Sequence, residues 1–242
     1  MGGLVRDERA ARLSELRTLL GRTTQAWGER SALEAGGRTL PLAAPLRPLL
    51  AGGGLRRGGT VAVESSIALV LALLAEASAA GAWCALVGLP EVGLVAAAEA
   101  GLAPGRLALV PRPGAELVAV TIALLDGLDL VAVAGGQRLS AGDRQRLSAR
   151  ARHCGSVLLP VGSWPGADVR LGVESGRWAG LGDSGGGAGR LRCRRVRVRA
   201  SGRGSACHER VSTLLLPGPD GMAAESSWPG ERLVPPLAQE AG

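Results

Sequence analysis

The sequence predicts an α/β protein with a mainly parallel central sheet flanked by helices, followed by a short antiparallel β-extension near the C-terminus. Between residues 61 and 161, short and almost wholly apolar runs alternate with longer runs at helical spacing. Apolar strands separated by helices of about ten residues are typical of a buried parallel sheet. After residue 162 short alternating segments lie between Gly-rich turns, which favours antiparallel strands. Hydrophobic residues make up 46% of the chain but aromatic residues only 2%, so Leu, Val and Ala must form most of the core.

The first expected element is a helix over residues 7–20, because acidic residues occupy its first turn and leucines recur on one face. This helix either docks on the main core or binds a partner, since both uses need the same spacing of apolar residues. The partner-binding candidates on it are Leu13, Leu16 and Leu20. Trp228, in the C-terminal segment "ESSWPGERLVPPL", is a further candidate for contact with a partner.

The parallel core is expected to begin after the loop "GGGLRRGG". Strands are expected at residues 61–63, 83–87, 107–110, 128–133 and 156–161, and helices at residues 67–79, 92–100, 115–125 and 141–153. Short antiparallel strands follow in "DVRLGVES", "GRWAGL", "RCRRVRVRA" and "RVSTLLLPG". The chain thus divides into an N-terminal helical arm (1–39), an α/β core (40–217) and a tail rich in Pro, Gly, Ser and Ala (218–242) that is expected to be disordered.

The charged residues exclude some chemistry and favour an acidic partner. All 28 basic side chains other than histidine are arginine, so no mechanism that needs a lysine ammonium is available. The net charge of +7 favours partners such as nucleic acid. No acidic residue lies between Ser184 and His208, where seven arginines are the DNA-binding candidates: Arg190, Arg192, Arg194, Arg195, Arg197, Arg199 and Arg203.

The segment "RRVRVRA" predicts how some of these arginines lie. Val196 and Val198 alternate with arginines, so on a strand the valines face the core while Arg195, Arg197 and Arg199 form an outward row. Such a row can contact successive phosphates. The alternative is a solvated strand whose charges protect it from aggregation.

Other patterns limit the location and the ligands. A charged N-terminus and a longest apolar stretch of residues 67–75 argue against a secretory signal and a membrane span, so a cytoplasmic location is expected. The four cysteines have no CxxC spacing, which predicts reduced thiols and no metal site. "GLGDSG", at residues 180–185, matches a dinucleotide-binding pattern, but an Arg-rich strand follows it and not a helix, which favours a hairpin loop.

The stretch "TVAVESSIALVLALL", residues 60–74, combines a strand, a short turn and a helix. Phosphate-binding loops have this arrangement, because a helix N-terminus offers free N–H groups and the positive end of the helix dipole. The larger segment "LLAGGGLRRGGTVAVESSIAL", residues 49–69, resembles the start of the ATP-binding core of RecA-type recombinases, whose P-loop reads G-P-E-S-S-G-K-T. The corresponding residues here are Ala62, Val63, Glu64, Ser65, Ser66, Ile67, Ala68 and Leu69.

Laid on that motif, the middle is kept and the phosphate and magnesium contacts are lost. Glu64, Ser65 and Ser66 match, whereas Ile67, Ala68 and Leu69 replace Gly-Lys-Thr. Further along, Pro90 stands where the family has its catalytic Glu, with Glu91 one step away, and Ala134 in "LDLVAVAG" replaces the Walker B aspartate. The resemblance extends over about residues 40–218 and implies a RecA-like core without catalytic residues or a bound cofactor.

A RecA-like core with these losses is similar to the ImuA-prime proteins of actinobacteria. That resemblance implies a non-catalytic adaptor of mutagenic translesion DNA synthesis that acts near the nucleoid. The implied partners are an ImuB-type polymerase homologue, RecA, an error-prone polymerase and DNA. Two alternatives stay open: a DNA-binding recombination mediator or regulator, and an ATPase with an unrecognised site.

Overall fold

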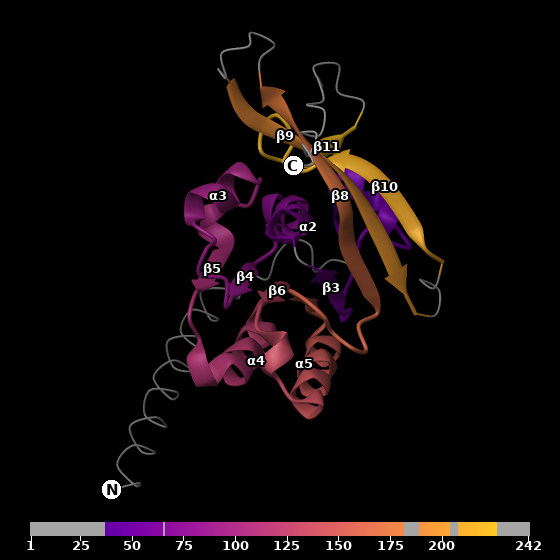
Figure 1. Cartoon of the computed structure of the whole chain (residues 1–242). Coiled ribbons are helices and arrows are strands. Elements are labelled where there is room, and N and C mark those ends of the chain that lie inside the picture. Colours follow the sequence, from indigo (N-terminus) through magenta and orange to yellow (C-terminus); the bar gives the residue numbers. More distant parts are fainter. Residues whose placement is uncertain (1–36, 65, 182–188, 204–207, 227–242) are drawn as a thin grey trace, which may run out of the picture. The chain divides into compact units, whose positions relative to one another are not determined.

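The computed structural model describes residues 37–64, 66–181, 189–203 and 208–226 (Figure 1). The expected N-terminal helix, with Leu13, Leu16 and Leu20, lies outside these residues, and so does Trp228. None of the helices in the described ranges has both the length and the apolarity that crossing a membrane requires.

The described residues form alternating strands and helices, followed by longer strands. The strands are β1 (Thr39–Leu40), β2 (Leu55–Arg56), β3 (Val61–Glu64), β4 (Cys84–Val87), β5 (Leu107–Val110), β6 (Leu130–Val133), β7 (Val157–Pro160), β8 (Val169–Leu181), β9 (Gly189–Gly202), β10 (Arg210–Leu215) and β11 (Ala224–Glu225). The α-helices are α2 (Ile67–Ala79), α3 (Leu94–Glu99), α4 (Leu117–Gly127) and α5 (Ala141–Cys154). Short 3-10 helices are η2 (Ala44–Leu49), η3 (Pro104–Arg106), η4 (Gly114–Glu116) and η5 (Gly136–Arg138).

Two sheets meet at β3. One is parallel and has the strand order β5-β4-β6-β7, and the other has the order β11-β10-β9-β8-β3. β3 pairs in parallel with β8 on one side and lies along β7 on the other, where Leu158 N donates to Gly59 O at 3.0 Å and Gly162 N donates to Val63 O at 2.8 Å. β9, β10 and β11 then continue in antiparallel fashion.

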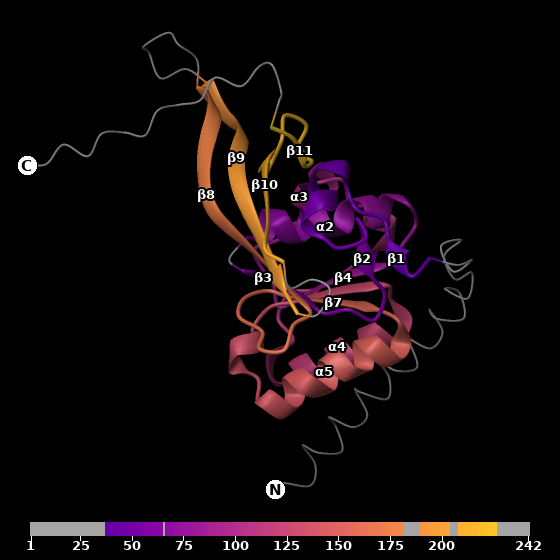
Figure 2. The same cartoon turned by 90° about the vertical axis from the view of Figure 1, so that its right-hand side faces the viewer.

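Helices cover both faces of the parallel sheet. Figures 1 and 2 place α2 and α3 against one face and α4 and α5 against the other. Serine side chains cap two of these helices: Ser66 Oγ accepts from Leu69 N, and Ser140 Oγ accepts from Asp143 N. A serine at the N-cap satisfies an N–H that the helix itself leaves unpaired.

The mixed α/β fold predicted from the sequence is confirmed, and each core element lies within a few residues of its expected bounds. The predicted pair of strands "DVRLGVES" and "GRWAGL" is wrong, because both belong to the single strand β8. β9 pairs along nearly all of β8, and a β-bulge between Val173 and Ser175 absorbs the irregularity that resembled a turn. The expected disorder from residue 218 does not hold for residues 218–226, where β11 pairs with the edge of β10.

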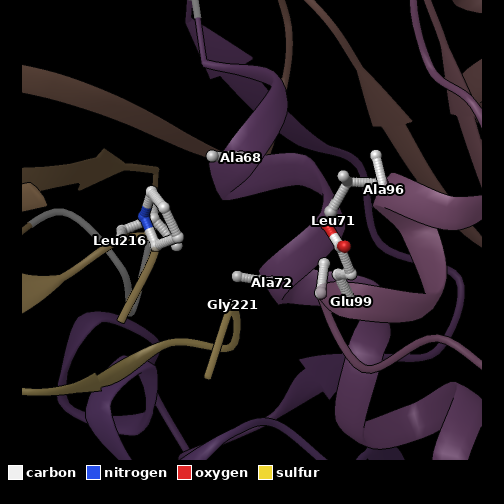
Figure 3. Close-up of a pocket in the computed structure, with 9 residues that line it drawn as sticks. Ala68, Leu71, Ala72, Ala96, Glu99, Leu216 and Gly221 are labelled. Carbon is white, nitrogen blue, oxygen red and sulfur yellow. The ribbon is translucent and has the colours of Figure 1, made fainter. Parts of the chain in front are cut away.

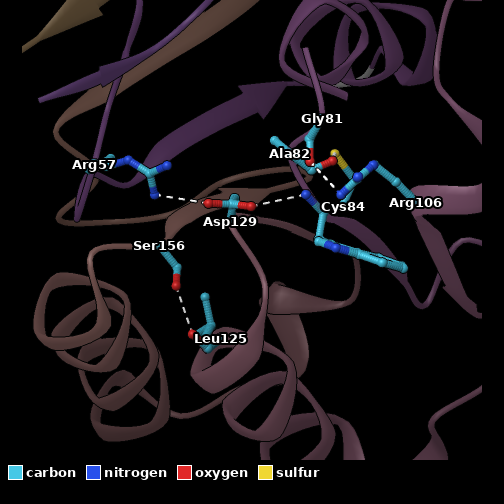
Figure 4. Close-up of polar contacts among 9 residues, drawn as sticks. Arg57, Gly81, Ala82, Cys84, Arg106, Leu125, Asp129 and Ser156 are labelled. Atoms are coloured by element: carbon cyan, nitrogen blue, oxygen red, sulfur yellow. Dashed lines mark hydrogen bonds and ion pairs between the residues drawn. The ribbon is translucent and has the colours of Figure 1, made fainter. Parts of the chain in front are cut away.

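Polar contacts stabilise the amino ends of β4, β6 and β7 (Figure 4). Asp129, just before β6, accepts from Arg57 Nη1 with one carboxylate oxygen and from Trp83 N with the other, each at 3.0 Å. Ser156, just before β7, donates to Leu125 O at 2.7 Å. Because these partners come from distant parts of the chain, they help to set the order of β4, β6 and β7.

The carboxyl end of β6 is closed by a buried tryptophan. Trp164 is 1% exposed, and its indole N–H donates to Ser148 Oγ at 3.2 Å. The ring lies against Gly136, where an added Cβ would come within 2.7 Å of a ring carbon. A residue with a side chain therefore does not fit at position 136 without displacing the tryptophan.

We predict that Gly136→Ala lowers the free energy of unfolding by about 1–3 kcal/mol, because the added methyl overpacks a closed site. Gly142→Ala is the matched control, since position 142 is an exposed residue of α5 where an added Cβ would make only an ordinary contact, at 3.8 Å with Ser140 Oγ. The control is expected to raise stability by up to about 0.5 kcal/mol through helix propensity. Urea unfolding followed by circular dichroism measures both, and equal midpoints for the two variants would contradict the packing argument.

Candidate functional site: the β3–α2 turn and an arginine face

The sequence around residues 61–79 forms the expected order of strand, short turn and helix, with β3 ending at Glu64 and α2 beginning at Ile67. Ala62 and Val63 are buried in β3, and the strand ends at the exposed residue Glu64. The Glu64 carboxylate lies over Gly172 of β8, where a Cβ would be 3.3 Å from its Oε2. Ser65 lies outside the described residues, and Ser66 is the N-cap of α2.

The first turn of α2 presents apolar side chains where a P-loop presents phosphate ligands. Leu69 is 0% exposed and belongs to the core, and Ile67 is half-buried. Leu69 N donates at 3.2 Å to Ser66 Oγ, so one N–H of this helix end already has a partner. A phosphate loop needs several free N–H groups, a lysine ammonium and a hydroxyl ligand for magnesium. Apart from free N–H groups, this turn offers none of these at the matching positions.

Ala68, at the position of the family's lysine, borders an apolar cavity of about 300 Å³ (Figure 3). The cavity lies between α2, α3 and the segment 216–221, and Leu71, Ala72, Ala96 and Leu216 contribute to its walls. Glu99 is the charged residue in the lining. An apolar lining with a carboxylate disfavours a phosphate and suits an apolar group.

The positions that match the acidic residues of the RecA-type family do not form a metal-binding or catalytic group. Ala134 follows β6, and its backbone packs against Gly88 after β4, where a Cβ would come within 3.2 Å of Ala134 O. Glu91 is exposed. Within the described ranges, no three His, Cys, Asp or Glu side chains gather closely enough to hold a metal ion.

Two described thiols are poor nucleophiles, because the thiolate is the reactive form. Burial raises the pKa of Cys84 to about 12. Partial burial, and then the hydrogen bond to Asp126, raise the pKa of Cys154 above its ordinary value. Both side chains therefore stay protonated at neutral pH.

The strand β9 has the predicted alternation. Val196 and Val198 are 1% and 0% exposed, whereas the side chains of Arg197 and Arg199 are 56% and 49% exposed. The valines thus lie on the core side of the antiparallel sheet and the two arginines on its solvent side.

Carboxylates contact both exposed arginines. Glu174 of β8 bridges them: its Oε2 lies 2.9 Å from Arg197 Nε, and its Oε1 pairs with Arg199 Nη2. Arg199 Nε also lies 3.3 Å from Glu209 Oε1. The sequence pattern predicted the arginine row but not these acidic partners, which come from β8 and from the residue just before β10.

The structure separates the other arginines that the sequence singled out. Arg195 is half-buried, and its Nη2 donates to Ser226 O at 3.4 Å. Arg194 lies on the valine side, with its guanidinium 5.8 Å from the ring centre of Trp178. Arg203 is exposed just after β9. The side chains of Arg190 and Arg192 are not among those that the structure describes.

Two further arginines lie on the same side of the sheet as Arg197. Arg170 and Arg177 of β8 are exposed, and the register places them opposite Ser201 and Arg195 respectively. The sequence signal for Arg170 was the alternation in "DVRLGVES", where it stands between an apolar valine and an apolar leucine. The missed β-bulge hid the position of Arg177, because one extra residue reverses the side to which the following residues point.

Known proteins match the parallel part of the chain. Residues 48–166 match the family described as the MT3502 N-terminal domain. The chain is also 43% identical over 116 residues to the uncharacterized protein Rv3395c of Mycobacterium tuberculosis, a match that covers 47% of this chain and 57% of that protein. The chain therefore spans little more than half the length of that curated relative.

We predict that MgATP changes the thermal midpoint by less than about 1 °C, because the β3–α2 turn lacks the charges that hold a triphosphate. A ligand at a hundred times its Kd would add about 2.7 kcal/mol to the free energy of unfolding and raise the thermal midpoint by several degrees. Thermal unfolding with and without MgATP measures this, with phosphate release as a parallel assay. A clear upward shift that Glu64→Ala or Glu91→Ala abolishes would reveal a nucleotide site and overturn the prediction.

Proposed function

We propose that this protein is a non-catalytic, RecA-like accessory protein of mutagenic translesion DNA synthesis, of the ImuA-prime type. In this role it bridges an ImuB-type polymerase homologue and other repair proteins, RecA and an error-prone polymerase among them, and works in the cytoplasm at the nucleoid. One observation carries the proposal: β3 and α2 follow in the strand–turn–helix order of a phosphate loop, but Ile67, Ala68 and Leu69 occupy the positions that match its ligand residues. A protein that has the fold of an enzyme family but lacks its ligand-binding and catalytic residues is better suited to binding partners than to catalysis.

Two further observations support it. The order of elements follows that of the resemblance, with a parallel α/β core followed by an antiparallel hairpin and a closing strand. The relative Rv3395c belongs to Mycobacterium tuberculosis, which fits the actinobacterial origin that the resemblance implies.

A second candidate function is a DNA-binding recombination mediator or regulator. The exposed Arg197 and Arg199 on the solvent side of β9 favour it, since an arginine row suits phosphate contacts. The two functions differ in what they need: an adaptor must bind polymerase partners without DNA, whereas a mediator must bind DNA directly.

Capture of a purified ImuB-type polymerase homologue by the immobilised full chain distinguishes them. For an adaptor we expect capture that survives nuclease treatment, raised salt and the triple change Arg195→Ala, Arg197→Ala and Arg199→Ala. For a mediator we expect no capture, together with a salt-dependent DNA affinity that the triple change abolishes.

A pull-down from DNA-damaged cells extends this test to partners not chosen in advance. Replication or repair proteins should be enriched over a mock preparation. Failure to recover any of them, together with failure to capture the polymerase homologue, would overturn the adaptor proposal.

A further inference from the structure

We propose that the solvent side of β8 and β9 binds the phosphate backbone of duplex DNA, and that Glu174 competes with the phosphates for two of its arginines. We call this surface the arginine face; it consists of Arg170, Arg177, Arg195, Arg197 and Arg199. The inference rests on the DNA contact of the proposed function and adds its surface, its ligand group and an acidic residue that lowers its affinity; Glu209 and Glu64 also place carboxylates near Arg199.

The register of β8 with β9 brings the residues of the arginine face together on one side of the sheet. Residues directly opposite each other in an antiparallel pair share one side of the sheet, and along a strand every second residue does so. The pairs are Arg170 with Ser201, Gly172 with Arg199, Ser175 with Arg197, and Arg177 with Arg195. On β10, Val211 and Thr213 lie beside Arg199 and Arg197. Five guanidinium groups therefore share one side of the sheet, and two of these arginines lie outside the Arg-rich segment.

The spacing and chemistry of this face suit phosphates. Outward residues on one strand lie roughly 7 Å apart, so Arg195, Arg197 and Arg199 form a regular row. A guanidinium presents parallel N–H groups that can bind two phosphate oxygens at once. Arg170, Arg177, Arg197 and Arg199 are exposed, so solvent reaches most of this face.

The aromatic content favours duplex DNA over single strands. Proteins that bind single strands usually stack bases on aromatic side chains. Trp178 is the only aromatic residue between positions 169 and 215, and it lies on the other side of the sheet, opposite Arg194. Among the described residues, this face therefore offers guanidinium groups for backbone contacts but no aromatic ring on which to stack bases.

Glu174 already occupies part of this surface. The β-bulge between Val173 and Ser175 inserts Glu174 as an extra residue, and its carboxylate contacts both Arg197 and Arg199. A phosphate that binds both guanidinium groups must displace these carboxylate oxygens. Glu174 is 27% exposed, so solvent and ligands reach the ion pairs. Its charge therefore lowers the affinity of the face for DNA in the free protein.

Titration of the full chain with a fluorescent duplex across a NaCl series tests this. We expect Glu174→Gln to tighten binding about three- to tenfold at moderate salt, because two exposed ion pairs no longer oppose it. Glu76→Gln, an exposed position on α2, makes the same change in net charge and is expected to have little effect.

The double variant Arg197→Ala, Arg199→Ala should weaken binding and make the plot of log K against log[NaCl] shallower by about 1.8, since each phosphate contact contributes about 0.9. Arg146→Ala, Arg152→Ala on the exposed side of α5 is the charge-matched control and should leave the slope close to that of the unmodified protein. Circular dichroism melting checks folding, and Arg197→Gln, Arg199→Gln replaces the alanine pair if that pair unfolds.

Equal DNA affinities for Glu174→Gln and Glu76→Gln would overturn the role of Glu174. Equal salt slopes for the variant that lacks Arg197 and Arg199 and the variant that lacks Arg146 and Arg152 would overturn the site. Single-stranded DNA that binds as tightly as duplex would contradict the duplex preference, and polyglutamate that competes as well as duplex would point to an acidic protein. No polymerase takes part in these titrations. A failure here therefore leaves the adaptor proposal intact, and a failed capture of the polymerase homologue leaves the arginine face intact.

Discussion

The pairing of β3 on both sides is the constraint on which the rest of the structure depends. β3 joins the parallel sheet through β7 and the antiparallel sheet through β8, so its backbone groups are shared between the two halves of the core. Such a strand must be apolar on both faces, and Val61, Ala62 and Val63 are accordingly buried. The same pairing sets the direction in which the chain leaves β3 toward α2 and fixes where the β8–β9 hairpin begins.

This constraint explains why the β3–α2 unit has a structural role that does not depend on a phosphate ligand. The strand, the Ser66 cap and the buried start of α2 are needed for folding whether or not a ligand is bound. Leu69 is packed into the core, so the first turn of α2 contributes to stability and presents no group that would hold a nucleotide. The carboxyl end of β6 is likewise filled by core packing, since Trp164 is packed against Gly136 there. Binding must then use surfaces away from the carboxyl ends of the parallel strands. The arginine face is such a surface in the described part of the chain.

Sequence reasoning located the core well, because burial of a parallel sheet leaves a local signal. Apolar runs marked β3, α2 and β5 to the residue or nearly so, since each run must match the period of its own element. It failed at β8, where Ser175 and Gly176 resembled a turn. Gly176 is explained instead by close packing, because a Cβ there would lie 2.5 Å from Arg194 Nε. A glycine that makes room for a neighbouring strand's side chain cannot be told from a turn glycine by local pattern alone.

The sequence by itself determined the absence of lysine, the apolar residues at the phosphate positions and the alternation of valine and arginine in β9. These are properties of residue type and of spacing within one strand. Only the tertiary structure decided that Arg170 and Arg177 join the row, that Arg194 turns to the other side beside Trp178, and that Glu174 bridges Arg197 and Arg199. The reason is physical: the sides on which these residues lie depend on the register and the bulge in the pairing of β8 with β9, and a shift of one residue moves every following side chain to the opposite face.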